Sequence, residues 1–391
     1  MKKVGLIVCY HIKNYGSVLQ SYATEKLVEK EGLPYECINY KKKKDLKFLW
    51  NNFLRCFNIT LLKTKLSFIK KKLYVKFLNK DLEKEFIKRN KIFDNFIDEN
   101  FKLSVPYHGY EELKKGMKEY SGVILGSDQV WNPMNLGNNY YTLNFVPENM
   151  PKITYAPSFG VSKIPSYQIE KTKKYLNRIQ YISVREQAGK KIIKELIDKD
   201  VPVVLDPTLM LTIDEWKEVY DKKRLIKEKY IFCYFLGSNT IHREWANEIK
   251  EKTGYKIVIL PHMDEIVKCD FNFGDIQYFE AGPKEFLNLI TNAEMVCTDS
   301  FHGTVFSILN HKKFLVLNRF SGTKKASTNS RIASLLNMLK LEDRLYIGEE
   351  NIYDAMEKDI NYSKVDIELE KHRKESKEYL DNAIKNSFIE R

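Results

Sequence analysis

A histidine beside hydroxyl groups and a glycine lies in residues 295–307, MVCTDSFHGTVFS. The pattern predicts a short buried strand, a polar turn at Ser300 and the first turn of an apolar helix. The N-terminus of a helix presents unpaired N–H groups and the positive end of its dipole, which favours an anion there. His302 can donate a hydrogen bond or titrate near neutral pH, and Gly303 and Thr304 follow it. We therefore expect this turn to bind a phosphorylated or carboxylated substrate, with chemistry nearby.

A structural role is the alternative for the same turn. Asp299 or Ser300 would then cap the helix while His302 packs in the interior. Downstream, Arg331 lies near the start of another predicted helix and offers a cation. The basic loop 318–325 before it contains Gly and Ser and could close as a lid over an anionic substrate. Because the histidine lies at the anion-binding end of a helix, we favour the functional interpretation.

Three other polar loops follow predicted strands. In the first, residues 11–17, Gly16 would let the backbone approach a ligand and Ser17 could cap the next helix. This loop lacks the G-x-G-x-x-G spacing of a dinucleotide site, so such a site is not supported. An ordinary turn between a strand and a helix is the alternative.

Asp128 carries the chemistry of the second loop, which follows an apolar run at 122–126. A carboxylate directly after a buried strand is costly to desolvate unless it is used. Asp128 could accept a proton from a sugar hydroxyl or hold that hydroxyl by hydrogen bonds. Its alternative role is to cap a turn or a helix.

Arg185 follows the third of these strands. A guanidinium at a strand end is a good bidentate ligand for phosphate or carboxylate. The alternative is a salt bridge with Glu186 or Glu195. Asp206 closes a further strand, and we expect it to cap the following helix.

Strand and helix signals alternate along both halves of the chain and predict an α/β fold of parallel sheets with crossover helices. Strands are expected at 4–9, 35–39, 122–126, 152–156, 181–184, 201–205, 230–236, 256–260, 294–298 and 314–317. Helices are expected at 17–30, 82–100, 110–120, 168–178, 186–197, 241–252, 283–292, 304–309, 329–339 and 367–387. The charged segment 214–228 marks the boundary, giving two Rossmann-like domains, 1–222 and 223–391. Such domains bind ligands in the cleft at the carboxyl ends of their strands.

The composition sets further limits. A chain of 391 residues favours two domains. No run approaches the ~18 apolar residues of a membrane span. The first apolar run is short and breaks at His11 and Lys13, so we interpret it as a strand and not as a signal peptide. The six scattered cysteines form no CxxC pair, which favours reduced thiols in the cytoplasm over disulfides or a metal site.

The formal net charge of +13 favours anionic partners. Much of it lies in a basic amphipathic insertion at 41–80, where Lys and Arg55 outnumber a single acidic residue, Asp45, and alternate with Phe, Leu and Trp50. Such a segment could lie on an anionic membrane surface. Alternatively, it forms a solvated helical hairpin whose apolar side packs on the domain. Nucleic-acid binding is not supported, because no known motif accompanies the charge.

Six motifs occur in order along the chain: Asn14–Gln20 (NYGSVLQ), Gly126–Trp131 (GSDQVW), Ser183–Glu186 (SVRE), Leu205–Thr208 (LDPT), Thr298–Thr304 (TDSFHGT) and Asn329–Arg331 (NSR). Together they resemble the polysaccharide pyruvyl transferase family over nearly the whole chain. The resemblance implies a glycosyltransferase-B-like fold, with an acceptor-side first domain and a donor-side second domain. It also implies transfer of pyruvate from phosphoenolpyruvate onto two hydroxyls of a sugar in a cell-surface or capsular polysaccharide precursor. The product is a cyclic ketal, phosphate is released, and neither a cofactor nor a metal is expected.

The resemblance also implies roles for residues. Phosphoenolpyruvate would be bound by Arg185 and the His302 loop, that is, by Arg185, Ser300, Gly303, Thr304 and Arg331 with His302. Many members of the family carry an arginine two residues before the histidine, where this chain has Ser300. Arg331 is our candidate for the missing cation.

On the acceptor side, the resemblance places Asp128 and the loop that begins at Asn14, with Gly16 and Ser127, beside the sugar. A mechanism follows, in which His302 handles the proton or the leaving phosphate and Asp128 accepts a hydroxyl proton. The acceptor would be a lipid-linked or nucleotide-linked sugar at the cytoplasmic face, with the 41–80 segment in peripheral contact with the anionic membrane.

Two rival functions stay open at this point. The first is a glycosyltransferase with a nucleotide-sugar donor, for which Asp264 and Glu265 could read the ribose or the base. The second is a saccharide-binding or membrane-surface relative without catalysis, which the serine at position 300 would suit.

Overall fold

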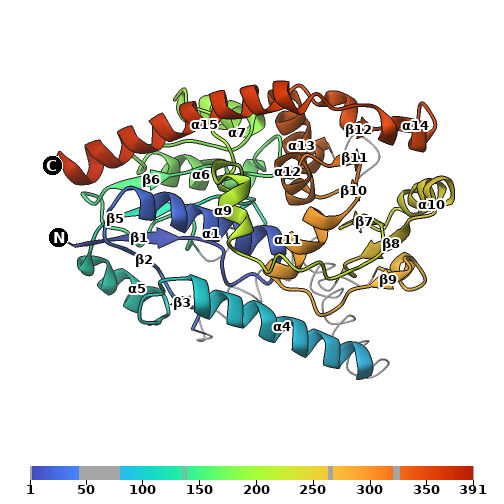
Figure 1. The fold of residues 1–391 in the computed structure, drawn as a ribbon. Coiled ribbons are helices and arrows are strands. Elements are labelled where there is room, and N and C mark those ends of the chain that lie inside the picture. Colours follow the sequence, from blue (N-terminus) through green and yellow to red (C-terminus); the bar gives the residue numbers. More distant parts are fainter. Residues whose placement is uncertain are drawn as a thin grey trace.

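A computed structural model describes residues 2–43, 80–134, 136, 139–262, 267–319 and 326–390 (Figure 1). Most of the predicted basic insertion, at 44–79, lies outside the described residues. So do residues 320–325 of the predicted lid, together with Asp264 and Glu265. The predictions for these segments stay predictions.

Four described strands form a parallel sheet in the order β2-β1-β5-β6. They are β1 (Lys3–Ile7), β2 (Tyr35–Cys37), β5 (Tyr120–Leu125) and β6 (Lys152–Thr154). Val4 and Leu6 point into one hydrophobic cluster and Ile7 into another. Because side chains alternate along a strand and both faces of this sheet are covered, β1 is apolar almost throughout.

Six described strands form a second parallel sheet in the order β12-β11-β10-β7-β8-β9. They are β7 (Tyr230–Tyr234), β8 (Lys256–Ile259), β9 (Ile276–Gln277), β10 (Met295–Thr298), β11 (Lys313–Leu317) and β12 (Leu345–Tyr346). A further short pair joins β3 (Tyr40–Lys41) to β4 (Tyr107–His108). We call the two large sheets, with the helices that precede or follow their strands, the first and the second unit. The predicted division at residue 222 falls between their strands.

The helices cover both faces of the sheets. In the first unit they are α1 (Tyr15–Lys30), α4 (Lys80–Asn100), α5 (Tyr110–Gly116), α6 (Ile169–Leu176), α7 (Gln187–Ile197), α8 (Pro207–Met210) and α9 (Ile213–Lys217). In the second they are α10 (Ile241–Thr253), α11 (Pro283–Asn292), α12 (Phe301–Leu309), α13 (Ala326–Met338), α14 (Ile352–Glu357) and α15 (Tyr362–Ile384). The predicted α/β fold with parallel sheets is confirmed.

Two predicted strands, 181–184 and 201–205, are wrong. Each is reduced to isolated bridges, Ile153 with Tyr181 and Val184 with Val203. Pro202 has no N–H group to continue a ladder, which limits the second segment to a single bridge. That bridge still brings the ends of both segments together.

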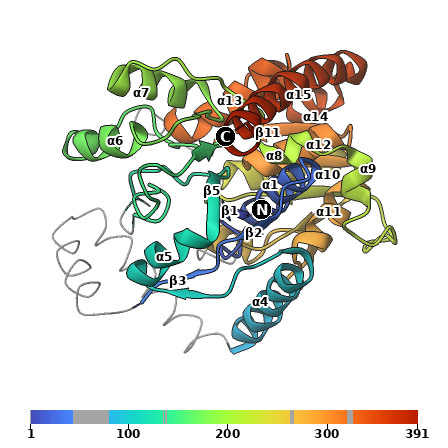
Figure 2. The ribbon, with the colours of Figure 1, turned by 90° about the vertical axis from the view of Figure 1, so that its left-hand side faces the viewer.

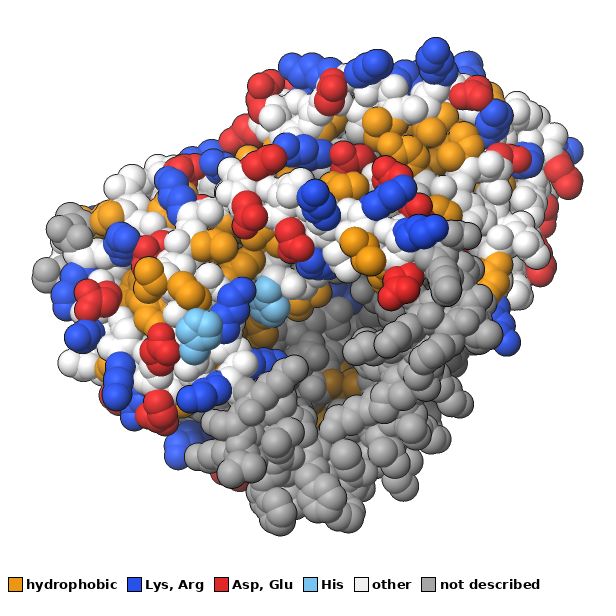
Figure 3. All heavy atoms as spheres, turned by 90° about the horizontal axis from the view of Figure 1, so that it is seen from below, with side chains coloured by type: hydrophobic (Ala, Val, Ile, Leu, Met, Phe, Trp, Pro, Cys, Tyr) orange, Lys and Arg blue, Asp and Glu red, His pale blue; other side chains and the backbone are white. Residues whose placement is uncertain are grey.

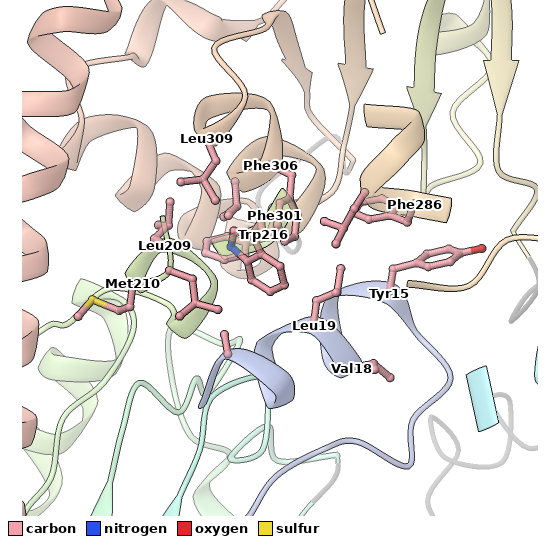
Figure 4. Packing of buried hydrophobic residues seen from close by; sticks show 14 of the residues in the cluster. Tyr15, Val18, Leu19, Leu209, Met210, Trp216, Phe286, Phe301, Phe306 and Leu309 are labelled. Carbon is pink, nitrogen blue, oxygen red and sulfur yellow. The ribbon is translucent and has the colours of Figure 1, made fainter. Parts of the chain in front are cut away.

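One hydrophobic cluster is common to both units. It continues from β1 through α1 and α12 to β7 and β10. Figure 4 shows Leu19 of α1 and Phe306 of α12 on either side of Trp216. The indole of Trp216 is fully buried, and its ring meets that of Phe306 edge-on at 5.0 Å. The charged segment 214–228 therefore contains a buried residue, Trp216, that packs against helices of both units.

Two helices also connect the units. Helix α4 runs along both, as Figures 1 and 2 show: its Arg89 donates to the Lys13 carbonyl of the first, and its Lys88 pairs with Glu280 of the second. Helix α15 returns from the second unit along the first (Figure 1), where Tyr379 donates to the carbonyl of Thr154. The two units are thus held together by more than the chain between them.

Basic and acidic side chains are interspersed over the face of the molecule in Figure 3. Many exposed charged side chains of the described residues form ion pairs, such as Lys284 with Glu99. Such pairs contribute little to stability. No helix in the described ranges is long and apolar enough to cross a membrane.

Candidate active site

A cavity of about 440 Å³ lies at the carboxyl ends of β1 and β5 and at the N-terminus of α12. The first unit contributes side chains that include those of Asn14, Ser17 and Asp128. From the second come Ser300, Phe301, His302, Arg319 and Arg331. Residues as far apart in the chain as Asn14 and Arg331 therefore face one space, as expected for a ligand site between two α/β units.

The turn at Ser300 caps α12. The Ser300 hydroxyl accepts a hydrogen bond from the Gly303 amide at 3.4 Å, so Ser300 has the capping role that we gave as the alternative for this turn. Its predicted role in donor binding stays a prediction. His302 lies in the first turn of the helix with its side chain only 9% exposed. The N-terminal turn of α1 packs directly on this ring, since a Cβ atom at Gly16 would lie 2.0 Å from His302 Nδ1.

The surroundings of His302 keep it neutral at pH 7. Burial lowers its pKa to about 4; the Asp206 carboxylate opposes this shift, and the Arg185 guanidinium adds to it. His302 Nε2 lies 3.8 Å from Asp206 Oδ1 and has no hydrogen-bond partner among the described residues. A neutral imidazole with an open nitrogen can accept a proton or bind a ligand.

Asp128 is the carboxylate that faces the cavity. Its Oδ2 accepts a hydrogen bond from the Ser17 hydroxyl at 2.5 Å and its Oδ1 one from the Gln129 amide at 2.8 Å. Burial favours the neutral acid, but Arg185, His302 and these hydrogen bonds outweigh it and lower the pKa of Asp128. Its φ of 80° is strained for a residue with a side chain, and such strain is often found at functional sites.

Arg185 lies behind the cavity wall. Its Nη1 donates to Asp206 Oδ2 at 2.5 Å, and its Nη2 is 3.9 Å from Asp128 Oδ1. The alternative considered from the sequence, a salt bridge of Arg185 with Glu186 or Glu195, is wrong, because Arg185 pairs with Asp206. Asp206 also accepts from the Thr208 amide, so its predicted role as a helix cap is confirmed.

The Asp206 carboxylate stays ionised in spite of its burial. Burial favours the neutral acid, but Arg185 and His302 outweigh it and lower the pKa of Asp206 to about 2. Asp206 and Asp128 thus lie on either side of the Arg185 guanidinium.

Arg331 does line the cavity, as does the ring of Phe301. The guanidinium carbons of Arg185 and Arg331 lie 4.5 and 5.9 Å from the centre of that ring. Burial lowers the pKa of Arg331 to about 10, and neighbouring Arg185 adds to the effect. The Nε atoms of both arginines are buried without a hydrogen-bond partner among the described residues.

Several predicted site residues build the turn and do not line the cavity. The Ser127 hydroxyl donates to the Ala156 carbonyl, and that of Thr304 donates to the Ser300 carbonyl. Gly303 lies against the Thr298 side chain, where a Cβ atom would be 2.4 Å from Oγ1. These three residues are not among those that line the cavity.

Sequence reasoning did not name as site residues three basic side chains that line the cavity: His11, Lys42 and Arg319. Arg319 belongs to the basic loop after β11, which sequence reasoning assigned to a lid. Its position at the carboxyl end of a strand was the signal that could have identified it. In the described ranges, no group of three His, Cys, Asp or Glu side chains is arranged to hold a metal ion.

Comparison with known proteins gives a family and a fold. The sequence model of the polysaccharide pyruvyl transferase family matches residues 14–321. No curated protein matches the sequence. A putative UDP-N-acetylglucosamine 2-epimerase from Listeria monocytogenes has a similar structure, with a TM-score of 0.51, 12% identity, and coverage of 100% of this chain and 98% of that one. The glycosyltransferase SnogD from Streptomyces nogalater gives a TM-score of 0.43, 9% identity and coverage of 98% and 100%. The similarity to the epimerase structure, with a TM-score above 0.5, and the two parallel sheets confirm the predicted glycosyltransferase-B-like fold.

Proposed function

Because the chain belongs to the polysaccharide pyruvyl transferase family, we propose that it transfers pyruvate from phosphoenolpyruvate to two hydroxyls of a saccharide. The product is a cyclic ketal, and phosphate leaves. The observation that carries this proposal is the cavity where the Asp128 carboxylate faces His302 and Arg331. A carboxylate can accept a proton from the hydroxyl of the acceptor, and cationic or hydrogen-bond-donating side chains can bind the anionic donor.

The donor side is rich in unsatisfied N–H groups. Arg185 Nε, Arg185 Nη2 and Arg331 Nε are buried with no hydrogen-bond partner among the described residues. A buried polar atom without a partner is costly, and an anion would supply acceptors. Arg331 and His302 are the groups of this cluster that reach the cavity, so we assign the phosphate and carboxylate of phosphoenolpyruvate to them. Arg185 does not line the cavity, but it forms an ion pair with Asp206 and lowers the pKa of Asp128.

The reaction balances with these groups. Proton transfer to the methylene carbon of phosphoenolpyruvate makes its second carbon electrophilic, and a sugar hydroxyl adds there while its proton passes to Asp128. The C–O bond to phosphate then breaks, the second hydroxyl closes the ketal, and its proton leaves with the phosphate. Asp128 then loses its proton to water and His302 takes one up from water, which restores both groups for the next turnover. His302 is neutral before the substrate binds, but a bound phosphate favours its protonated form. We therefore assign proton delivery to His302.

The acceptor in this proposal is a lipid-linked or nucleotide-linked sugar of a cell-surface or capsular polysaccharide precursor. The 41–80 segment, with its basic and aromatic residues, would hold the enzyme at the anionic cytoplasmic face of the membrane. Flotation with anionic liposomes tests this part. Equal flotation of the full chain and of a 41–80 deletion would refute it.

The central experiment measures phosphate release from phosphoenolpyruvate against a panel of lipid-linked and nucleotide-linked sugars. We expect release with at least one acceptor and a loss of roughly 10²- to 10⁴-fold for His302→Ala. His311→Ala is the matched control, because this histidine lies just beyond the same helix and its side chain is 49% exposed. Consumption of a nucleotide sugar with no turnover of phosphoenolpyruvate would instead favour a glycosyltransferase.

A further inference from the structure

Three loops of the second unit meet at one buried carboxylate, that of Asp299. They follow β7, β10 and β11, which are neighbours in the sheet. Asp299 Oδ1 accepts a hydrogen bond from the Leu236 amide at 2.6 Å, and Oδ2 one from the Gly237 amide at 2.8 Å. The side chain of Asp299 is fully buried. These two amides hold the Asp299 carboxylate in one orientation.

Arg319 comes from the third loop and lies over this carboxylate. Its Nη2 donates to the backbone carbonyl of Asp299 at 2.8 Å, and its Nε is 3.6 Å from Asp299 Oδ1. Gly237 leaves room for this approach, since a Cβ atom there would be 2.8 Å from both Arg319 Cγ and Asp299 Oδ2. The position of the arginine is therefore fixed from two sides.

The same arginine reaches the cavity. Arg319 lines it beside Ser300 and Arg331, and its side chain is 17% exposed. Ser300 is short, and its hydroxyl is used by the Gly303 amide. The guanidinium that follows β11 thus places a positive charge in the cavity near the α12 N-terminus, where position 300 itself presents no cation.

We propose that Arg319 joins Arg331 and His302 in binding the phosphate group of the donor, and that Asp299 is the positioning residue that orients Arg319. This inference rests on the proposed function for the identity of the donor as phosphoenolpyruvate. The inference goes beyond the proposed function because it adds Arg319 and its partner Asp299, which link three loops, to the residues that recognise the phosphate. Arginine suits the role because its planar fork matches two phosphate oxygens.

The test uses the full-length enzyme and titrates it with inorganic phosphate and with phosphoenolpyruvate by calorimetry. For Arg319→Gln we expect the Kd of both to rise about 10- to 100-fold, the size of a lost hydrogen bond to a charged group. Arg319→Lys should recover part of the affinity, because it restores charge without the fork. Arg224→Gln is the matched control, since this arginine of the same unit is exposed, does not line the cavity and donates to the carbonyl of Asn292.

Asp299→Asn tests the positioning role. It should weaken phosphate binding in the wild-type background and have no further effect in Arg319→Gln, because its target is then gone. In steady state, both variants should raise the KM for the donor more than the KM for the acceptor. Wild-type phosphate affinity in Arg319→Gln, or an equal loss from Asp299→Asn in both backgrounds, would overturn the proposal. Because phosphate binding needs no turnover, these results stand apart from a failure to find pyruvyl transfer.

Discussion

Replacing Gly16 with alanine tests whether the contact between the units sets the position of His302. The three atoms nearest to a Cβ at this position all belong to the imidazole, at 2.0, 2.5 and 2.6 Å. Ordinary contact begins near 3.4 Å, so the ring must retreat by about 1.4 Å, the difference between 3.4 and 2.0 Å. A displacement of about 1 Å at a catalytic group can cost roughly 100-fold in rate.

Stability provides a second measure of the same contact. Gly16 lies in the first turn of α1, where alanine alone would stabilise the helix by about 0.5–1 kcal/mol. Overpacking a buried contact costs about 1–3 kcal/mol. We therefore expect Gly16→Ala to destabilise the protein by about 1–2 kcal/mol in denaturant unfolding and to lower phosphate release roughly 100-fold.

The double variant with His302→Ala is the control. Without the imidazole the clash is gone, so Gly16→Ala should now stabilise the protein by about 0.5–1 kcal/mol. A loss of the same size in both backgrounds would show that the strain lies elsewhere in α1. Wild-type activity and stability in the single variant would refute the contact itself.

Three further predictions concern the charges of the site. Asp128→Asn keeps the volume and removes the base, so phosphate release in steady state should fall roughly 10²- to 10⁴-fold, and an unchanged rate would exclude that role. Arg185→Met leaves the buried Asp206 without its partner, which should cost about 3–5 kcal/mol in denaturant unfolding; a loss under about 1 kcal/mol would contradict the pairing. His302, with its pKa lowered to about 4 in the folded state, binds fewer protons than in the unfolded state between pH 6.5 and 4. Stability should therefore fall as the pH drops through this window, and His302→Ala should show a shallower fall; identical pH profiles would contradict the assignment.

Local signals in the sequence predicted many elements well. Helix α11 occupies the predicted range 283–292, because Pro283 suits the first helical position and an apolar stripe follows. Helix α12 begins three residues earlier than predicted, at Phe301, because Ser300 supplies its cap. Helix α9 was missed, since only its capping box at Thr212 and Glu215 marks it within a charged stretch.

The site required tertiary information that local patterns do not contain. Arg185 meets Asp206 because Val184 bridges Val203, whereas sequence reasoning considered only nearer glutamates. The contact between Gly16 and His302 exists only once two units have been assembled. Thr304 was predicted to bind the donor, but its hydroxyl donates to the carbonyl four residues earlier, as threonines in helices often do. Here a local hydrogen bond within the helix decided the role of the side chain.

The path of α15 has a consequence for synthesis on the ribosome. Ser376 accepts a hydrogen bond from the Leu205 amide, and Phe388 packs where Gly122 leaves space in β5. The first unit therefore completes its core with residues made about 160–170 positions after its own last helix, α9, a delay of roughly 10–30 s at ordinary translation rates. During that interval the first sheet has an uncovered apolar surface, which a chaperone could bind. Folding of the first unit is thus expected to finish only after the second has emerged.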